Sequence, residues 1–271
     1  MRFRASITNV PTFFRIIQAI EKLQKKCIIK FTETSMHIIC NHDANEGGIQ
    51  VWSQIKVDAI FANYRIQSNA NNEITVGLAS EALLGALKSA STSTTSSSSF
   101  DTEEVVMKLA KKNDQALFSF EISGMSRVGH RLRVAHDVKI EVMRPADVEK
   151  LKEPLCPDPD LHILLPPLQK LRTIVERMRP LSDVLAVRAN NNKRLVLAIS
   201  TESVRVETEW TDCRNTALFA QLNVTLDNEG DGADDEIADP DKLFTVLIST
   251  RSFLKFLNSH VVSTTTIAGP Y

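Results

Sequence analysis

The chain has 271 residues, of which 43% are hydrophobic, and this is enough for two domains that each bury a core of their own. It has no apolar run of the roughly 18 residues needed to cross a bilayer, and its start lacks the apolar segment of a signal peptide, so we expect a soluble intracellular protein without membrane contact. The formal net charge of −1 becomes informative only when the charges are located along the chain.

One segment holds much of the acidic charge. Eight carboxylates and no basic residue lie between Asp227 and Asp241. Such a run is typical of a solvated loop, because like charges repel one another and stay hydrated. Removing eight negative charges from −1 leaves +7 for the rest of the chain, and a moderately basic remainder permits a polyanionic partner.

The first half predicts a strand, a helix and many further strands. Alternation over residues 2–8 predicts a half-buried strand, and apolar residues at every third or fourth position over 11–26 predict an amphipathic helix with proline in its first turn. Strands are expected at 27–31, 36–40, 49–55, 60–66 and 74–78. A helix that starts at Ser80, a good N-cap residue, and strands at 105–110, 117–122 and 132–143 complete this half.

Two segments do not fit regular structure. The Ser/Thr tract Ser89–Ser99 is too polar to order itself by burial, so we expect a flexible loop there. Several prolines lie between Arg144 and Asp160, and each removes a backbone donor and restricts the residue before it. We therefore expect a first domain at 1–143, a linker at 144–160 and a second domain at 161–271.

The second half repeats the plan of the first. A strand at 161–165, a helix at 167–179 and strands at 184–188 and 195–199 follow the linker, and a strand at 243–248 precedes a helix at 250–260. The matched blocks lie roughly 155 to 170 residues apart, which indicates an internal duplication. The fold class predicted is α+β, with two tandem domains, each built of antiparallel sheets with two helices on one face.

The predicted helices are biased toward basic residues on the faces opposite their apolar stripes, and these residues are expected at equivalent places in both halves. The basic residues on or beside these faces are Arg15, Lys22, Lys25, Lys26, Lys88, Lys170, Arg172, Arg177, Arg251 and Lys255. The only carboxylates on the helices are Glu21, Glu81 and Glu176. A single amphipathic helix normally has a charged exterior, but mixed signs are usual there, so the bias favours contact with phosphates without sequence reading.

Motifs for an enzyme are lacking in the sequence: it has no Gly-rich phosphate loop, nucleophile elbow or His-Glu-x-x-His helix. The nearest cluster is Cys40, His42 and Asp43, and no second cluster completes a metal site. The four cysteines are far apart in sequence and are expected to be reduced thiols. We therefore expect no catalytic residues, no metal and no cofactor.

Several short stretches resemble a known family. They are Met1-Arg2-Phe3-Arg4-Ala5, Asn71-Asn72-Glu73-Ile74, Ser80-Glu81, Ala86-Leu87-Lys88, His136-Asp137-Val138, Glu153-Pro154, Pro157-Asp158-Pro159-Asp160, Leu165-Pro166 and Val175-Glu176-Arg177-Met178. With the duplicated plan, the chain resembles sliding clamps of the proliferating-cell nuclear antigen type, and more specifically the Hus-type subunit of the heterotrimeric checkpoint clamp, the nine-one-one complex. The resemblance covers Met1 to about Ile267, and the linker motif is its most specific part.

The resemblance implies a nuclear subunit of a three-membered ring that encircles double-stranded DNA in the DNA damage checkpoint, with helices lining the hole and the ten basic residues above facing DNA. It also implies that strands 132–143 and 203–210 pair with two other clamp-type subunits. The interface residues implied are Leu132, Val134, Val138, Ile140, Val142, Val204, Val206 and Thr208. A clamp loader is expected to place the ring on DNA, and repair factors are expected to dock in a groove beneath the linker. Family members continue for further strands, so the second domain is expected to be incomplete.

Three alternatives remain open. The chain could form a homotrimeric replicative clamp of the same fold. It could be a metal-dependent nuclease that uses Cys40, His42 and Asp43, or a scaffold without DNA contact whose basic faces are buried against partners.

Overall fold

The computed structural model describes residues 1–41, 49–92, 100–126, 128–155, 161–213, 241–264 and 266–268. The chain divides into two compact units, Met1–Pro154 and Leu155–Tyr271, and the division falls within the segment expected to be a linker. In that segment Pro145–Val148 form the short helix α3. No helix in the described ranges is long and apolar enough to cross a membrane.

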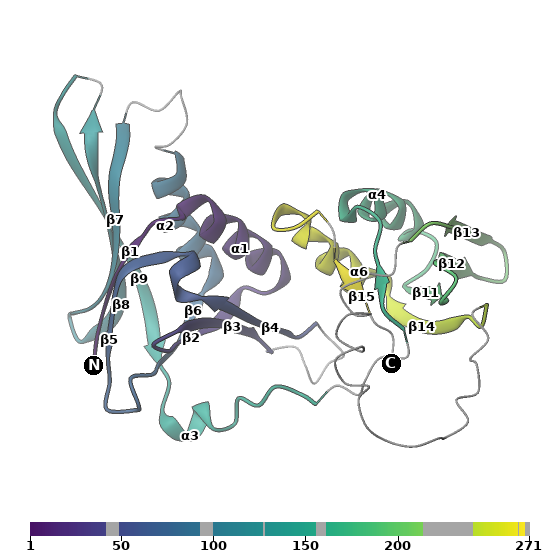
Figure 1. The fold of residues 1–271 in the computed structure, drawn as a ribbon, viewed down its shortest axis with the longest axis horizontal. Coiled ribbons are helices and arrows are strands. Elements are labelled where there is room, and N and C mark those ends of the chain that lie inside the picture. The colour runs from purple at the N-terminus through teal and green to yellow at the C-terminus, as the bar shows by residue number, and fades with distance from the viewer. Residues whose placement is uncertain are drawn as a thin grey trace, which may run out of the picture. The chain divides into compact units, whose positions relative to one another are not determined.

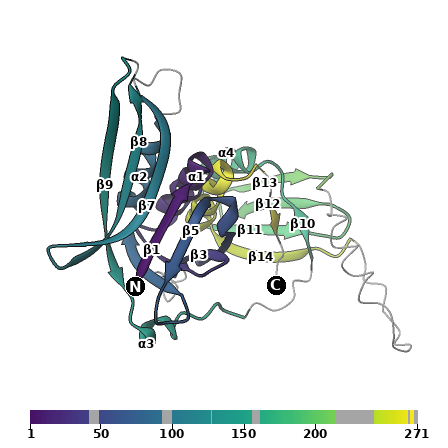
Figure 2. The same cartoon turned by 60° about the vertical axis from the view of Figure 1, so that its left-hand side comes forward.

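The described part of unit 1 contains nine strands and two long helices. Its elements are β1 (Arg2–Ile7), α1 (Val10–Leu23), β2 (Lys26–Phe31), β3 (Ser35–Cys40), β4 (Val51–Lys56), the 3-10 turn η2 (Val57–Ala59), β5 (Phe61–Gln67), β6 (Ile74–Ala79), α2 (Ser80–Thr92), β7 (Phe100–Lys112), β8 (Gln115–Ser126) and β9 (Arg131–Val142). The strands form one sheet in the order β4-β3-β2-β6-β9-β8-β7-β1-β5, and every neighbouring pair is antiparallel. Figure 2 shows the long strands β7, β8 and β9 beside one another.

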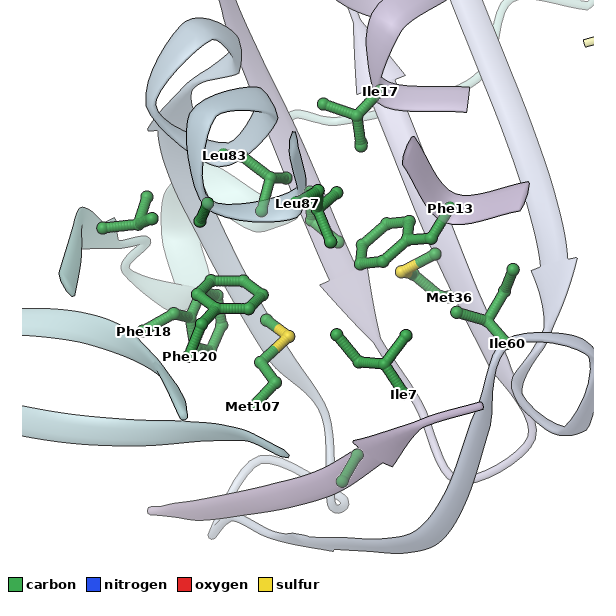
Figure 3. Packing of buried hydrophobic residues seen from close by; sticks show 14 of the residues in the cluster. Ile7, Phe13, Ile17, Met36, Ile60, Leu83, Leu87, Met107, Phe118 and Phe120 are labelled. Carbon is green, nitrogen blue, oxygen red and sulfur yellow. The ribbon is translucent and has the colours of Figure 1, made fainter. Parts of the chain in front are cut away.

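Alternation along the strands places one face of this sheet under α1 and α2, which pack side by side (Figure 1). In β1, Phe3, Ala5 and Ile7 enter the core while Arg2 and Arg4 point to the other face. The core closes around aromatic rings: Phe31 lies 4.7 Å from Phe3 between ring centroids. Figure 3 shows Phe13 and Ile17 of α1 and Leu83 and Leu87 of α2 above residues of the sheet.

Unit 2 repeats the arrangement on a smaller scale. Its elements are β10 (Ile163–Leu164), α4 (Leu168–Met178), β11 (Val184–Ala189), β12 (Leu195–Ser200), β13 (Arg205–Trp210), β14 (Phe244–Ser249), α6 (Thr250–Leu257), the 3-10 turn η3 (Asn258–Val261) and β15 (Ile267–Ala268). The strands form a four-stranded antiparallel sheet, β13-β12-β11-β14, and a two-stranded sheet, β10-β15. Helices α4 and α6 pack against each other, and a separate core joins them to the sheet.

The duplication is visible in the packing of the first helix of each unit. Val10, Phe13, Ile17 and Ile20 of α1 are buried, and so are Leu168, Leu171, Val175 and Met178 of α4, at a constant offset of 158 residues. The second helix of each unit begins in the same way. The backbone N–H of Ser80 donates to the carbonyl of Lys25, and that of Thr250 to the carbonyl of Asp183, at 2.9 Å in both cases.

Some expected boundaries were wrong. Helix α1 ends at Leu23 rather than Lys26, because Gln24 adopts an extended backbone (φ −145°, ψ 143°) that leads directly into β2. Ser89–Thr92 belong to α2, so the expected loop does not begin at Ser89, and residues 93–99 lie outside the described ranges. The acidic run lies outside them too except for Asp241, which accepts a 2.8 Å hydrogen bond from Asn192.

Candidate DNA-facing helices and subunit edges

Helix α1 presents two cations on the side away from its core stripe. The Asn9 side chain accepts from the N–H of Thr12 at 3.2 Å and caps the helix start. Arg15 and Lys22 are exposed, as is Lys25 in the turn that follows the helix. Lys22 lies 3.1 Å from the carboxylate of Glu21, so part of its charge is balanced locally. Arg15 on the helix and Lys25 in the following turn carry the less compensated charge.

In unit 2, α4 exposes Lys170 and Arg177 opposite the buried Leu171 and Val175. Arg172 lies at the side of this surface and is half-buried. Its Nε donates to Glu176 one turn along the helix at 2.9 Å, so the cation is already paired. The charge that remains available on α4 is therefore mainly that of Lys170 and Arg177.

The second helices contribute less charge. Lys88 is exposed on α2 and Glu81 is exposed near the start of the same helix. On α6, Arg251 is exposed and Lys255 is half-buried, opposite the buried Thr250 and Leu257.

Lys26 does not share this surface. It is the first residue of β2, where Cys27, Ile29 and Phe31 enter the core beneath the helices. Because successive side chains of a strand point to opposite faces, Lys26 lies on the sheet face away from α1. The expectation that Lys26 faces the same partner as Arg15 is wrong. The error arises because α1 ends earlier than expected, so that Lys26 belongs to β2.

The expectation that basic residues recur at equivalent positions is also wrong. At the offset of 158 residues that aligns the buried residues of α1 and α4, Arg15 corresponds to Thr173, and Lys170 corresponds to Thr12. The core positions are therefore repeated between the units, whereas the individual cations are not. What the two helices share is the sign of the exposed charge.

The expected interface strand β9 is an edge strand over only part of its length. It pairs with β8 from Arg131 to Lys139, but with β6 only from Ile140 to Val142. Among the described residues, no strand therefore pairs with the second side of residues 131–139. Leu132 and Val134 are 45% and 39% exposed on this open part.

Three of the expected interface residues on β9 need correction. Val138 and Ile140 are each only 2% exposed and belong to the core of unit 1, because they point toward the helices. The backbone of Val142 is already paired with Val76 on β6, although its side chain is exposed. A partner subunit can meet the side chains of Leu132 and Val134 on this strand, but not those of Val138 or Ile140.

Strand β13 forms one edge of the four-stranded sheet in unit 2. Val206 and Thr208 are half-buried on it, and Val204 lies in the preceding turn, where its N–H donates to Thr201 Oγ1 at 3.0 Å. On the alternate face, Glu207 accepts from Arg205 at 2.8 Å, and this contact, ahead of that with Arg188, holds the pKa of its carboxyl below the ordinary value. Among the described residues this edge has no neighbouring strand, so it offers backbone groups beside charges that are balanced within the chain.

The metal alternative meets a chemical obstacle at Cys40. The side chain is 1% exposed, and burial, followed by the proximity of Cys27, raises the pKa of its thiol to about 12. A metal ligand must be the thiolate, so Cys40 is a poor ligand at neutral pH. His42 and Asp43 lie outside the described residues, and among those described no group of three or more metal-binding side chains comes together. Cys27, Cys40 and Cys213 are free and buried.

A cavity of about 660 Å³ lies beside the first part of the linker, within unit 1. Its walls come from the loop between β5 and β6, the end of β9 and helix α3, and include Ile74, Val142, Met143, Pro145 and Val148. These apolar walls next to an exposed segment are suited to a docked side chain.

Comparisons with known proteins agree with this architecture. Residues 1–269 match the family model described as Hus1-like protein. The chain is 33% identical to the checkpoint protein hus1 of Schizosaccharomyces pombe over 80% of this chain and 72% of that protein, and 32% identical to the checkpoint protein HUS1 of Homo sapiens over 98% of this chain and 89% of that protein.

A solved structure of the proliferating cellular nuclear antigen from Entamoeba histolytica superposes with a TM-score of 0.66 at 13% identity, covering 99% of this chain and 89% of the other. This likeness confirms the predicted clamp fold. Together with the match over almost the whole sequence, it leads to the assignment that the chain belongs to the Hus1-like protein family.

Proposed function

We propose that this chain is a subunit of a DNA damage checkpoint sliding clamp, a ring that encircles DNA and recruits checkpoint and repair proteins. The observation on which this rests is the Hus1-like match over residues 1–269 of a chain with the clamp fold. The relatives that it resembles are checkpoint proteins.

The ring would be a heterotrimer in which this chain contacts two different clamp-type neighbours. One contact uses the open part of β9 with Leu132 and Val134, and the other uses β13 with Val206 and Thr208. Strand addition suits both places, because an edge strand offers donors and acceptors that a neighbouring strand can satisfy.

Inside the ring, the exposed cations of the helices would contact DNA phosphates weakly and without reading sequence. In this proposal Arg15, Lys25, Lys170, Arg177 and Arg251 make the principal contacts. Lys22 and Arg172 contribute less because each is paired with a neighbouring glutamate, and Lys255 because it is half-buried, while Lys88 adds a single charge from α2. Contacts of this kind hold a duplex electrostatically while allowing the protein to slide.

The chain would work in the nucleus by topological linkage, without catalysis or a cofactor of its own. A clamp loader would place it on DNA, and the cavity beside α3 would receive repair factors.

The assembly can be tested by purifying the tagged chain from its own cells under mild salt and identifying what accompanies it. We expect two different clamp-like chains at equal stoichiometry. The homotrimeric alternative is examined in the same preparation by measuring the native mass of the isolated chain. A stable trimer of this chain alone would contradict the heterotrimer.

A further inference from the structure

A compact group of arginines lies on the sheet face of unit 1 that points away from the helices. Arg2 and Arg4 are exposed on β1, where they alternate with the buried Phe3 and Ala5. Arg4 lies directly opposite Arg65 of the neighbouring strand β5, and on its other side it lies opposite Lys108 of β7. Arg2 lies opposite Gln67, which adds neutral donors at the same place. We call Arg2, Arg4 and Arg65 the arginine cluster.

Like charges directly opposite one another on neighbouring strands are destabilising. Within the described residues, no ion pair or hydrogen bond to another side chain offsets the charge of Arg2, Arg4 or Arg65. Lys108 differs, because its ammonium is paired with the carboxylate of Glu121. The chain thus keeps three uncompensated guanidinium groups together, although their proximity costs stability.

Several cations elsewhere on the same sheet face are already paired. Glu121 is shared between Lys108 and Arg133, and Asp137 is paired with Lys112. A duplex lying along this face would bring its regularly spaced phosphates against these carboxylates. The arrangement therefore suits a small, concentrated anion at the cluster rather than an extended polyanion.

We propose that the arginine cluster binds a phosphorylated serine or threonine side chain in a segment of a partner protein. Neighbouring strands are about 4.7–4.9 Å apart, so the guanidinium groups of Arg4 and Arg65 can reach the same phosphate group. Arginine forms bidentate hydrogen bonds with phosphate oxygens, and a phosphate monoester carries close to two negative charges at neutral pH. Arg2 completes a site with three cations, and this docking surface lies away from the helices assigned to DNA.

The test uses the full chain and a degenerate peptide library with one fixed phosphoserine, compared with the same library carrying unmodified serine. We expect the wild-type chain to retain the phosphorylated library about tenfold better, and the variant Arg4→Gln/Arg65→Gln to lose this preference. The variant Lys111→Gln/Lys112→Gln removes two positive charges from the same sheet and should keep it.

Thermal unfolding of the same proteins provides a second readout. Relief of the repulsion between Arg4 and Arg65 should leave the Arg4→Gln/Arg65→Gln variant at least as stable as wild type, so that lost binding cannot be ascribed to unfolding. Equal retention of both libraries by the wild type, or an undiminished preference in the arginine variant, would overturn the proposal. So would stronger arginine-dependent retention of a short single-stranded oligonucleotide than of the phosphorylated library. Failure of ring assembly would not affect these outcomes, because the probe binds the isolated chain.

Discussion

The hydroxyl of Ser80 donates to the carbonyl of Gln24 at 2.9 Å, and the hydroxyl of Thr250 donates to the carbonyl of Ser182 at 3.0 Å in the other unit. Ser80 and Thr250 are both fully buried first residues of the second helix in their units. The acceptors Gln24 and Ser182 differ by 158 residues, the offset that also relates the buried residues of α1 and α4. Both units therefore join their two helices by the same contact.

Loss of this contact should destabilise each unit separately. In Ser80→Ala the buried carbonyl of Gln24 loses its partner, and in Thr250→Val the partly buried carbonyl of Ser182 does, so we expect the free energy of unfolding to fall by about 1–3 kcal/mol. Hydrogen exchange should show the loss in β2 and β6 for the first variant and in β11 and β14 for the second. The control is Thr173→Ala, which removes an exposed hydroxyl that donates to Gln169 at 3.1 Å and should change stability by less than about 0.5 kcal/mol. Equal effects of all three substitutions would contradict the assigned role.

Lys22 and Lys26 are four residues apart but lie on opposite faces of unit 1, so they form a matched pair for testing DNA contact. Lys22→Glu in the assembled ring should weaken retention of duplex DNA and reduce the slope of log affinity against log salt, by less than about 1 because Glu21 balances part of the charge of Lys22. Lys26→Glu makes the same change of charge on the far face of the sheet and should leave the slope unaltered. Measuring the affinity of each variant for short duplexes at several salt concentrations gives both slopes. An equal response of the two variants would show that the helix face does not contact DNA.

Substitutions at different positions along β9 distinguish residues of the expected interface from residues of the core. Replacing the exposed Leu132 and Val134 by Asp should prevent association with a neighbouring subunit and change the stability of the isolated chain by less than about 0.5 kcal/mol per residue. Val138→Asp buries an unpaired charge and should cost more than about 4 kcal/mol, enough to unfold unit 1. Size-exclusion chromatography and chemical denaturation give the two readouts. Normal assembly of the Leu132→Asp/Val134→Asp variant would show that this edge is not the contact.

The lowered pKa of Glu121 predicts that the free energy of unfolding depends on pH. The Lys108 ammonium, and after it the Arg133 guanidinium, lower the pKa of this carboxyl below its ordinary value of 4.5 against the opposing effect of partial burial. A carboxyl with a lowered pKa in the folded state stabilises the fold above its ordinary pKa, and the contribution disappears as the pH falls through the folded value. Glu121→Gln should therefore lower the free energy of unfolding by about 1 kcal/mol at neutral pH.

The difference between Glu121→Gln and wild type should begin to shrink as the pH falls below 4.5, where the unfolded carboxyl is protonated, and should vanish at the lower pH where the native carboxyl is protonated too. Urea denaturation at several pH values measures this difference. Glu103→Gln on the same sheet alters an exposed carboxyl and serves as the control. A difference that stays constant down to the acid limit would show that the ion pair is not its cause.

Periodicity predicted most of the helices and strands, because buried residues recur at different spacings in the two kinds of element. Phe13, Ile17 and Ile20 indicate the helix, and Phe3, Ala5 and Ile7 indicate the strand beside it. The side to which a terminal residue points was less predictable. Lys26 continues the helical pattern in sequence, but the extended backbone of Gln24 turns it to the other face of the sheet.

Periodicity does not predict which distant strands pair with one another. The long alternation of β9 gives no sign of which part of the strand the helices cover, so it does not separate the buried Val138 and Ile140 from the exposed Leu132 and Val134. The alternation Arg2-Phe3-Arg4-Ala5 does place two arginines on one face, but only the register of β1 with β5 brings Arg65 beside Arg4.

Topological linkage to DNA is the central claim, and it is tested most directly by loading the assembled complex onto nicked circular DNA, washing at raised salt and then cutting the circle once. We predict that the complex stays on the closed circle and slides off the cut molecule, since the contacts from the helices are individually weak. Equal retention on circular and linear DNA would contradict the account.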